Sequence, residues 1–168
     1  MKLRTLSIFA AAVLLAACSS TPENASTGAG GGGTGATPPE TSAPAAGFVA
    51  GSVDDFLKNV GDRVFFDFDK SNLREDAKAT LDKQIAWLKK YPNWSITVEG
   101  HCDERGTREY NLALGERRAN SVKQYMAANG IPASRLKTIS YGKERPAVQG
   151  SNEAAWAQNR RGVTVLGQ

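Results

Sequence analysis

The segment from Ser19 to Gly47 has no aromatic or large aliphatic side chain, and this restricts where the chain can fold. It consists almost entirely of Gly, Ala, Thr, Ser and Pro, and its only charged residues are Glu23 and Glu40. Such a segment lacks the apolar surface whose burial would offset the loss of chain entropy. We therefore expect a flexible tether with an end-to-end distance of about 30 Å. A packed core must come from the residues that follow it.

Regular apolar patterning defines one domain over residues 51–168, and about 118 residues is a usual size for a single domain. Alternating apolar residues predict strands at Val64–Phe68, Trp94–Gly100, Leu136–Tyr141 and Gly162–Leu166. Helical spacing and helix-end signals predict helices at Ala77–Leu88, about Thr107–Asn129 and Asn152–Asn159. We therefore expect an α/β (α+β) fold, a two-layer sandwich of a small mixed sheet with helices packed on one face.

The N-terminus has the three parts of an export signal. Lys2 and Arg4 precede an uncharged, mostly apolar run that ends at Leu15-Ala16-Ala17-Cys18. The run is about a dozen residues long, whereas a helix needs about 20 to cross a bilayer. Its end resembles the bacterial lipobox, in which the cysteine is lipidated and becomes the new N-terminus. We expect residues 1–17 to be a lipoprotein signal peptide and residues 18–50 to be a lipidated N-terminus and tether.

Cys18 is the expected lipidation site. Each buried CH₂ contributes about 0.8 kcal/mol, so a multiply acylated cysteine anchors a protein permanently. Ser19 and Ser20 stand where lipoproteins retained at the inner membrane commonly carry Asp. The resemblance therefore implies attachment to the periplasmic face of the bacterial outer membrane.

Charge and cysteine content argue against nucleic-acid binding and against an intramolecular disulfide. Removing Lys2 and Arg4 with the signal lowers the net charge of +4 by two, which leaves too small an excess to indicate nucleic-acid binding. Lipidation of Cys18 leaves Cys102 as the sole thiol in an oxidising compartment. No intramolecular disulfide is expected.

An arginine interrupts the apolar stripe of the second predicted helix. Tyr110, Leu114, Val122 and Met126 recur at intervals that place them on one buried face. Arg118 lies within that face, about 40° from both Leu114 and Val122 on a helical wheel. Because a guanidinium is costly to bury without a partner, Arg118 should meet a carboxylate. The pattern leaves two partners open, a ligand or an internal salt bridge to Asp69 or Asp103.

The loop His101–Thr107 joins the second predicted strand to the second predicted helix, a common place for binding groups. Asp103 can offer its carboxylate to a cation. The backbone amides near Gly106 and Thr107 can bind a carboxylate at the helix N-terminus. The loop is therefore suited to a zwitterion.

A metal site or a catalytic site fits these residues less well than a binding site. His101, Cys102 and Asp103 are adjacent and seldom converge on one metal ion, and the chain has no second histidine. Adjacency also argues against Cys-His catalysis, whose groups face each other across a site. A glycoside hydrolase would need a carboxylate opposed to Asp103, for which Asp67 or Asp69 remains open. We expect no metal, no cofactor and no enzymatic activity, with a cell-wall hydrolase as the alternative.

Several motifs occur in the order found in one known family. They are Phe66–Lys70, Gly100–Thr107, Tyr110-Asn111, Leu114, Glu116–Ala119, Val122, Tyr141–Pro146 and Asn159–Arg161. These stretches resemble the OmpA-like peptidoglycan-binding domain, and the likeness covers about residues 60–166. Together with the lipobox, they are most similar to the peptidoglycan-associated lipoproteins within that family.

The resemblance implies non-covalent binding of the peptide stem of peptidoglycan through meso-diaminopimelate, without turnover. It implies that Asp103 binds the free ammonium of the ligand and Arg118 its carboxylate. The resemblance also implies that Asp69, Thr107, Asn111 and Leu114 line the same pocket as Asp103 and Arg118.

The resemblance also implies partners. They are TolB, which binds an overlapping surface, and through it the Tol complex of the inner membrane, which acts in envelope integrity and cell division. A module that binds only proteins, with Arg118 in an internal salt bridge, remains an alternative. Asn159 and Arg160 match a motif expected to be mainly structural. Cys102 departs from the family pattern, which has a small residue such as Ala or Thr beside the Asp.

Overall fold

The computed structural model describes residues 49–167. The predicted signal peptide, the lipidation site Cys18 and almost all of the predicted tether lie outside the described residues. Within residues 49–167, no helix is both long and apolar enough to cross a membrane.

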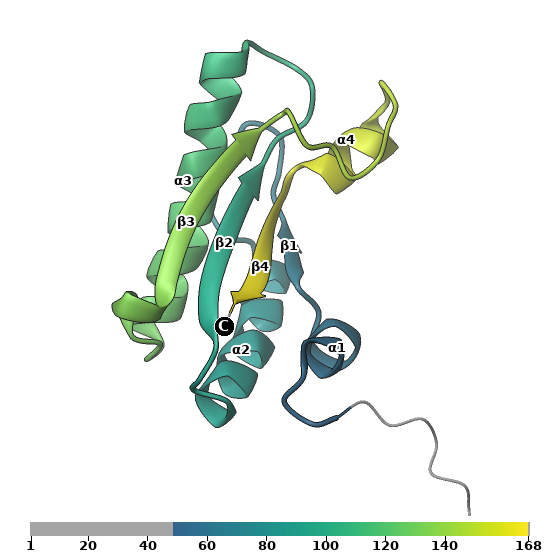
Figure 1. Ribbon diagram of the computed structural model, residues 1–168. Helices are drawn as coiled ribbons and strands as arrows, with labels where there is room; N and C mark the ends of the chain where they lie inside the picture. Colours follow the sequence, from purple (N-terminus) through teal and green to yellow (C-terminus); the bar gives the residue numbers. More distant parts are fainter. Residues whose placement is uncertain (1–48, 168) are drawn as a thin grey trace, which may run out of the picture. The chain divides into compact units, whose positions relative to one another are not determined.

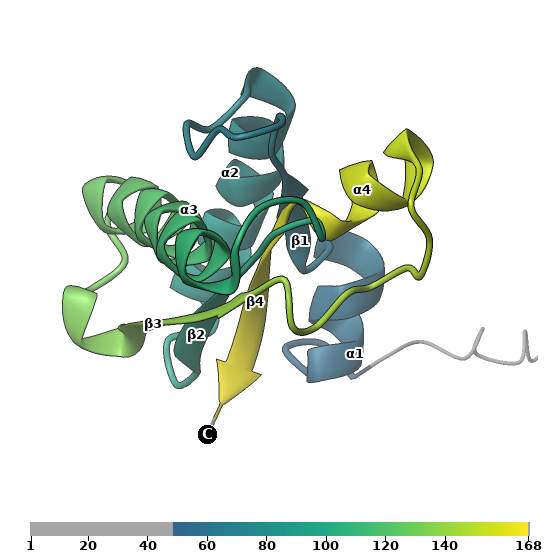
Figure 2. The same cartoon turned by 90° about the horizontal axis from the view of Figure 1, so that it is seen from above.

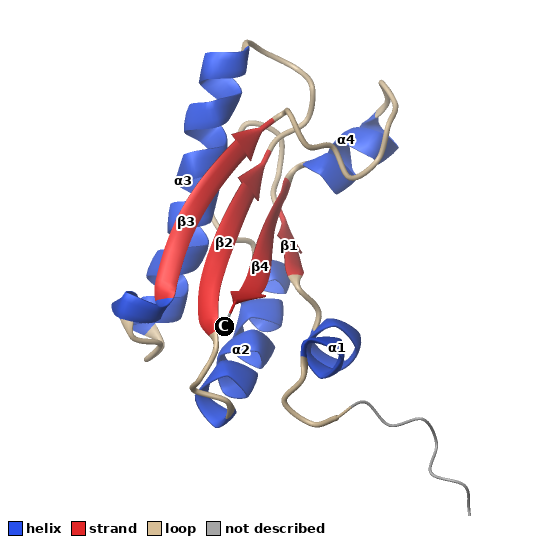
Figure 3. Cartoon of the chain, in the orientation of Figure 1, coloured by secondary structure: helices blue, strands red, loops and turns tan. Residues whose placement is uncertain are grey.

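Four strands form one mixed sheet in the order β1-β4-β2-β3 (Figures 1 and 3). The strands are β1 (Arg63–Phe65), β2 (Ser95–His101), β3 (Leu136–Gly142) and β4 (Arg161–Gly167). Strands β2 and β3 are parallel, whereas β4 runs antiparallel to both β1 and β2. The predicted mixed sheet is therefore confirmed.

Two long helices, α2 (Glu75–Lys90) and α3 (Arg108–Ala128), cover the same face of the sheet (Figure 2). Helix α3 and the short 3-10 turn η2 (Ala133–Arg135) form the crossover that parallel β2 and β3 require. A third predicted helix is α4 (Glu153–Asn159), which lies beyond the end of the sheet in Figure 1. The two-layer α/β architecture is confirmed.

Both predicted ends of α3 are also confirmed. The side chain of Thr107 accepts a hydrogen bond from the backbone N–H of Tyr110 at 3.2 Å, which makes Thr107 the N-cap. Gly130, two residues after the helix, has φ = 93°, a conformation that glycine adopts without steric cost.

A short helical segment before the sheet was not predicted. It comprises α1 (Val53–Asp55) and the π-helical turn η1 (Phe56–Val60), which together are too short to show a clear apolar period. Phe56 is fully buried, with its ring centroid 5.0 Å from that of Trp87. The segment therefore extends the core beneath α2.

The first strand is shorter than predicted. It ends at Phe65, and Phe68, which we expected to alternate inward, is 56% exposed. The chain turns away after Phe66, and Asp69 has φ = 56°, a left-handed conformation that cannot continue a strand. The end of the apolar alternation therefore belongs to the β1–α2 loop.

The hydrophobic core lies between the sheet and the two long helices. Ala77, Leu81, Ile85 and Leu88 of α2 are all buried, as the helical spacing predicts. From α3 and the sheet come Ala119, Val122, Met126, Val64, Ile96, Val98 and Leu136.

Two glycines bring α3 into backbone contact with β2. A Cβ on Gly100 would lie 1.8 Å from the carbonyl oxygen of Gly115, and one on Gly115 would lie 2.3 Å from Ser140 Oγ. Neither position has room for a side chain. This close approach fixes α3 over the end of β2 and so sets where Asn111 and Arg118 project.

Candidate functional site

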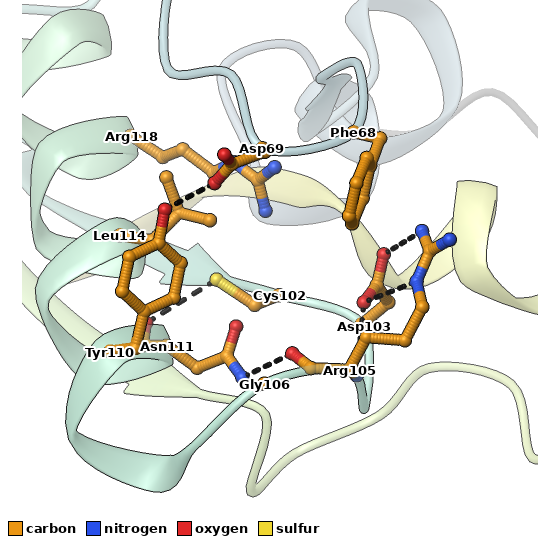
Figure 4. Close-up of a pocket in the computed structure, with 10 residues that line it drawn as sticks. All are labelled: Phe68, Asp69, Cys102, Asp103, Arg105, Gly106, Tyr110, Asn111, Leu114 and Arg118. Atoms are coloured by element: carbon orange, nitrogen blue, oxygen red, sulfur yellow. Dashed lines mark hydrogen bonds and ion pairs between the residues drawn. The ribbon is translucent and has the colours of Figure 1, made fainter.

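A pocket of about 170 Å³ opens where β2 and β1 end and α3 begins (Figure 4). Five of the six residues that we expected at the peptidoglycan site line it, namely Asp69, Asp103, Asn111, Leu114 and Arg118. Its other lining residues are Phe68, Cys102, Arg105, Gly106 and Tyr110. The β1–α2 loop thus meets the β2–α3 loop and α3, which are distant from it in sequence, around one small cavity.

Arg118 reaches the pocket from α3 and is fully buried. Its Nε donates to the carbonyl oxygen of Lys70 at 2.8 Å, Nη1 to that of His101 at 2.8 Å, and Nη2 to that of Asp67 at 3.1 Å. Within residues 49–167 it makes no salt bridge to Asp69 or Asp103, so the internal salt bridge that the pattern left open is not formed. A guanidinium has five N–H groups, and carbonyl oxygens take three of those of Arg118.

The charge of Arg118 is desolvated and is not neutralised by direct contact with a carboxylate of the described residues. Burial lowers the pKa of Arg118, and the guanidinium lies 5.2 Å from the ring centroid of Phe66. Neutral carbonyls satisfy hydrogen bonds without cancelling the charge. A carboxylate from outside would supply both a counter-charge and two acceptors.

Asp103 lies across the pocket in the β2–α3 loop and is 4% exposed. Its carboxylate accepts from Arg105 Nη2 at 2.6 Å and from Arg160 Nη1 at 3.4 Å. Burial alone would raise its pKa, but the hydrogen bonds and charge of Arg105 outweigh that effect, so the pKa of Asp103 lies below its usual value. Asp103 is therefore ionised at neutral pH and is a poor proton donor.

Asp69 and Tyr110 form a hydrogen bond across the rim of the pocket. The Tyr110 hydroxyl donates to Asp69, and this bond raises the pKa of the phenol. Tyr110 is 46% exposed, so its assignment to the buried stripe is wrong. The first turn of α3 projects past the end of the sheet, and its inner face therefore borders the pocket rather than the core.

Asn111, Leu114 and Cys102 form the inner wall. The Asn111 amide donates to the carbonyl oxygens of Arg105 at 2.7 Å and Thr107 at 3.1 Å, which fixes the loop. The Cys102 thiol is buried and donates to the Asn111 carbonyl oxygen at 3.3 Å, and burial raises the pKa of that thiol. Cys102 is thus a packed residue and not a reactive thiolate.

Thr107 is the predicted site residue that does not line the pocket. Its side chain caps α3, and its carbonyl oxygen accepts from Asn111. It supports the loop from outside the cavity.

Asn159 and Arg160 hold the surroundings together. Asn159 Oδ1 accepts from the backbone N–H groups of Ala147 and Val148, at 2.7 and 3.1 Å. Arg160 donates to the carbonyl oxygen of Phe66 at 3.1 Å as well as to Asp103. Both contacts are those of structural residues, and that of Arg160 also positions Asp103.

Sequence reasoning missed Phe68, Arg105 and Tyr110 as pocket residues. Phe68 looked like a strand residue, and Tyr110 looked like a core residue. Arg105 carried a usable signal, because it lies two residues after an acid whose partner was unknown. Among residues 49–167, no group of three or more His, Cys, Asp or Glu side chains has the arrangement of a metal site.

Comparison with known proteins gives consistent matches. Residues 65–160 match the model of the OmpA family. The "Peptidoglycan-associated lipoprotein" of Mesorhizobium japonicum is 49% identical over 158 residues, which cover 93% of this chain and 87% of the relative. The protein of the same name from Rhizobium meliloti is 60% identical over 117 residues, but these cover 70% of this chain and only 66% of the relative.

A solved structure supports the same assignment. The crystal structure of the peptidoglycan-associated lipoprotein from Burkholderia pseudomallei superposes with a TM-score of 0.61 at 40% identity. The match covers 63% of this chain and 90% of that one. The chain therefore belongs to the OmpA family and, within it, to the peptidoglycan-associated lipoproteins.

Proposed function

We propose that the domain binds the peptide stem of peptidoglycan without covalent chemistry, through a group that carries both an ammonium and a carboxylate. The observation that carries the proposal is the buried guanidinium of Arg118, which lines the pocket and is bonded to three carbonyl oxygens but to no carboxylate among residues 49–167. Asp103 supplies a buried anion in the same pocket.

The size of the pocket supports a small end group as the ligand. Sites for drug-sized molecules measure roughly 300–1,000 Å³, whereas this one measures about 170 Å³. It admits the end of one side chain and leaves the rest of a larger molecule outside. The free end of meso-diaminopimelate in a peptide stem has the required ammonium and carboxylate on one carbon.

Binding without turnover agrees with the electrostatics. A general acid of a glycoside hydrolase needs a raised pKa, whereas the contacts of Asp103 lower its pKa. The contacts of Asp103 therefore stabilise its ionised form and do not favour the transfer of a proton to a substrate.

The proposal extends to the whole lipoprotein. Lipidation of Cys18 would anchor it to the periplasmic face of the outer membrane, and the segment from Ser19 to Gly47 would let the domain reach the wall. Such a protein would link the outer membrane to peptidoglycan. We also propose TolB and the Tol complex as its partners in envelope integrity and cell division.

Co-sedimentation of residues 49–168 with isolated sacculi tests the binding proposal. We expect Arg118→Met and Asp103→Asn to lower the bound fraction at least tenfold. Arg108→Met and Asp54→Asn make the same charge changes at exposed positions outside the pocket and should bind like wild type. Circular dichroism must show that all variants fold. Full binding by folded Arg118→Met would refute the site.

Two further measurements separate the alternatives. Soluble fragments released from sacculi in amounts that grow with time, and that depend on Asp103, would establish a hydrolase. A domain that ignores sacculi but still captures purified TolB would be a protein-interaction module.

A further inference from the structure

The carboxylate of Asp103 is fully occupied by its own neighbours. Oδ1 accepts from the backbone N–H of Arg105 at 3.1 Å and from its Nε at 3.2 Å. Oδ2 accepts from Arg105 Nη2 at 2.6 Å and from Arg160 Nη1 at 3.4 Å. A carboxylate offers about four lone-pair sites. An ammonium from a ligand can therefore bind Asp103 only after one of these donors leaves.

Arg105 is the donor that can leave. Arg160 is only 7% exposed and is also held by the Phe66 carbonyl oxygen and by Glu153 Oε1, at 3.1 and 2.7 Å. The side chain of Arg105 is 30% exposed and belongs to a loop. In Figure 4 it curls back onto Asp103 at the side of the pocket that Phe68 borders.

The surroundings of Arg105 suit a cation that has two positions. Its guanidinium carbon lies 4.0 Å from the ring centroids of both Phe68 and Trp156, close enough for cation–π attraction. Nη1 lies 3.9 Å from Glu153 Oε2, so a second carboxylate is within reach when Asp103 is given up. Releasing Asp103 thus leaves the Arg105 guanidinium beside another anion and two aromatic faces.

We propose that Arg105 is a specificity-determining residue: it binds Asp103 as an internal cation, and a ligand gains Asp103 only by bringing an ammonium that displaces it. This inference rests on the proposed binding of peptidoglycan. A ligand with a carboxylate alone binds Arg118 and leaves Arg105 in place. A ligand with both groups makes both contacts, and Asp103 remains neutralised because one cation replaces another.

Calorimetry with two muropeptides tests the displacement. One carries free meso-diaminopimelate, and in the other the same side-chain amine is acetylated. Since Arg105→Gln removes the competitor, it should bind the free amine at least threefold more tightly than wild type and should not bind the acetylated ligand more tightly. Arg105→Lys keeps the charge but loses the fork-shaped contact. Its affinity for the free-amine ligand should lie between those of wild type and Arg105→Gln. Arg108→Gln is the charge-matched control and should match wild type.

Tryptophan fluorescence gives a readout that a purely structural role would not change. The chain has three tryptophans, so Trp156→Phe identifies the signal of the one stacked on Arg105. Saturating free-amine ligand should change the emission of wild type, but not that of Trp156→Phe or Arg105→Gln. The acetylated ligand should leave the emission of all three proteins unchanged.

Affinity of folded Arg105→Gln for the free-amine ligand that is equal to or below that of wild type would overturn the inference, because Arg105 would then only position Asp103. The proposed function would still stand in that case if wild type binds the muropeptide and Asp103→Asn does not. Failure of wild type to bind either the muropeptide or sacculi would instead refute the proposed function, and this inference with it.

Discussion

The two halves of the domain bury different chemistry. Beneath α2 the buried side chains are mostly apolar, and Phe56, Leu81 and Leu88 are fully enclosed. At the end of the sheet beside α3, Arg118 and Asp103 are buried to a similar degree. Apolar burial is favourable in any orientation, whereas a buried polar group is tolerated only with partners in fixed directions. The first half therefore contributes stability, and the second defines a site.

The two buried ions of the pocket also differ in how their charges are compensated. Arg118 is held by three backbone carbonyls and keeps its charge uncompensated by contact with an acid of the described residues. Asp103 is held by two guanidinium groups and has its charge compensated. One end of the pocket is ready for a ligand, and the other must exchange a partner first.

The largest effect on stability should come from the apolar half. Leu81→Ala removes a fully buried side chain and should lower the free energy of unfolding by about 2–5 kcal/mol. Its affinity for the free-amine muropeptide should stay within twofold of wild type where the variant is folded. Urea unfolding and calorimetry measure the two quantities. A parallel loss of affinity would show that the two halves are coupled.

An intermediate effect should come from the single histidine, His101. Its Nδ1 has no hydrogen-bond partner among the described residues, and burial, followed by the charge of Arg161, lowers its pKa to about 4. The unfolded chain binds a proton near pH 6.5. The contribution of His101 to stability is therefore complete above about pH 6.5 and falls by up to about 3 kcal/mol as the pH drops toward 4.

His101→Phe keeps a ring beside Tyr141 and removes the titration. The difference in unfolding free energy between pH 7 and pH 4.5 should shrink in this variant, as measured by urea titration at both values. An unchanged difference would assign the acid sensitivity to carboxylates instead.

The smallest effect should come from Thr107, the expected site residue that lies outside the pocket. Thr107→Ala removes the N-cap bond to Tyr110 and should cost about 1 kcal/mol. Binding should not change, since Thr107 does not line the cavity. Asn111→Ala is the matched comparison within the pocket and should weaken binding measurably. Weaker binding by Thr107→Ala would show that Thr107 contributes to the binding site after all.

Local sequence was sufficient for most of the fold. Helices α2, α3 and α4 and strands β2, β3 and β4 agree with their apolar periods, because periodicity records which face of an element is buried. It was insufficient at β1, where Phe68 continues the alternation after the chain has turned away. The division of the chain at residue 51 stays a prediction.

The residue pattern alone reveals a buried charge on α3 and an acid in the loop before it. The partners of these two charges follow only from the packing of segments that are far apart in the chain. Arg118 is satisfied by carbonyls of Asp67 and Lys70, 51 and 48 residues away, in a loop whose path depends on the packing of α2 and α3. Asp103 is occupied by Arg105, which Trp156 from α4 helps to hold. Periodicity reports the burial of each residue singly, whereas a hydrogen bond depends on the relative placement of two segments.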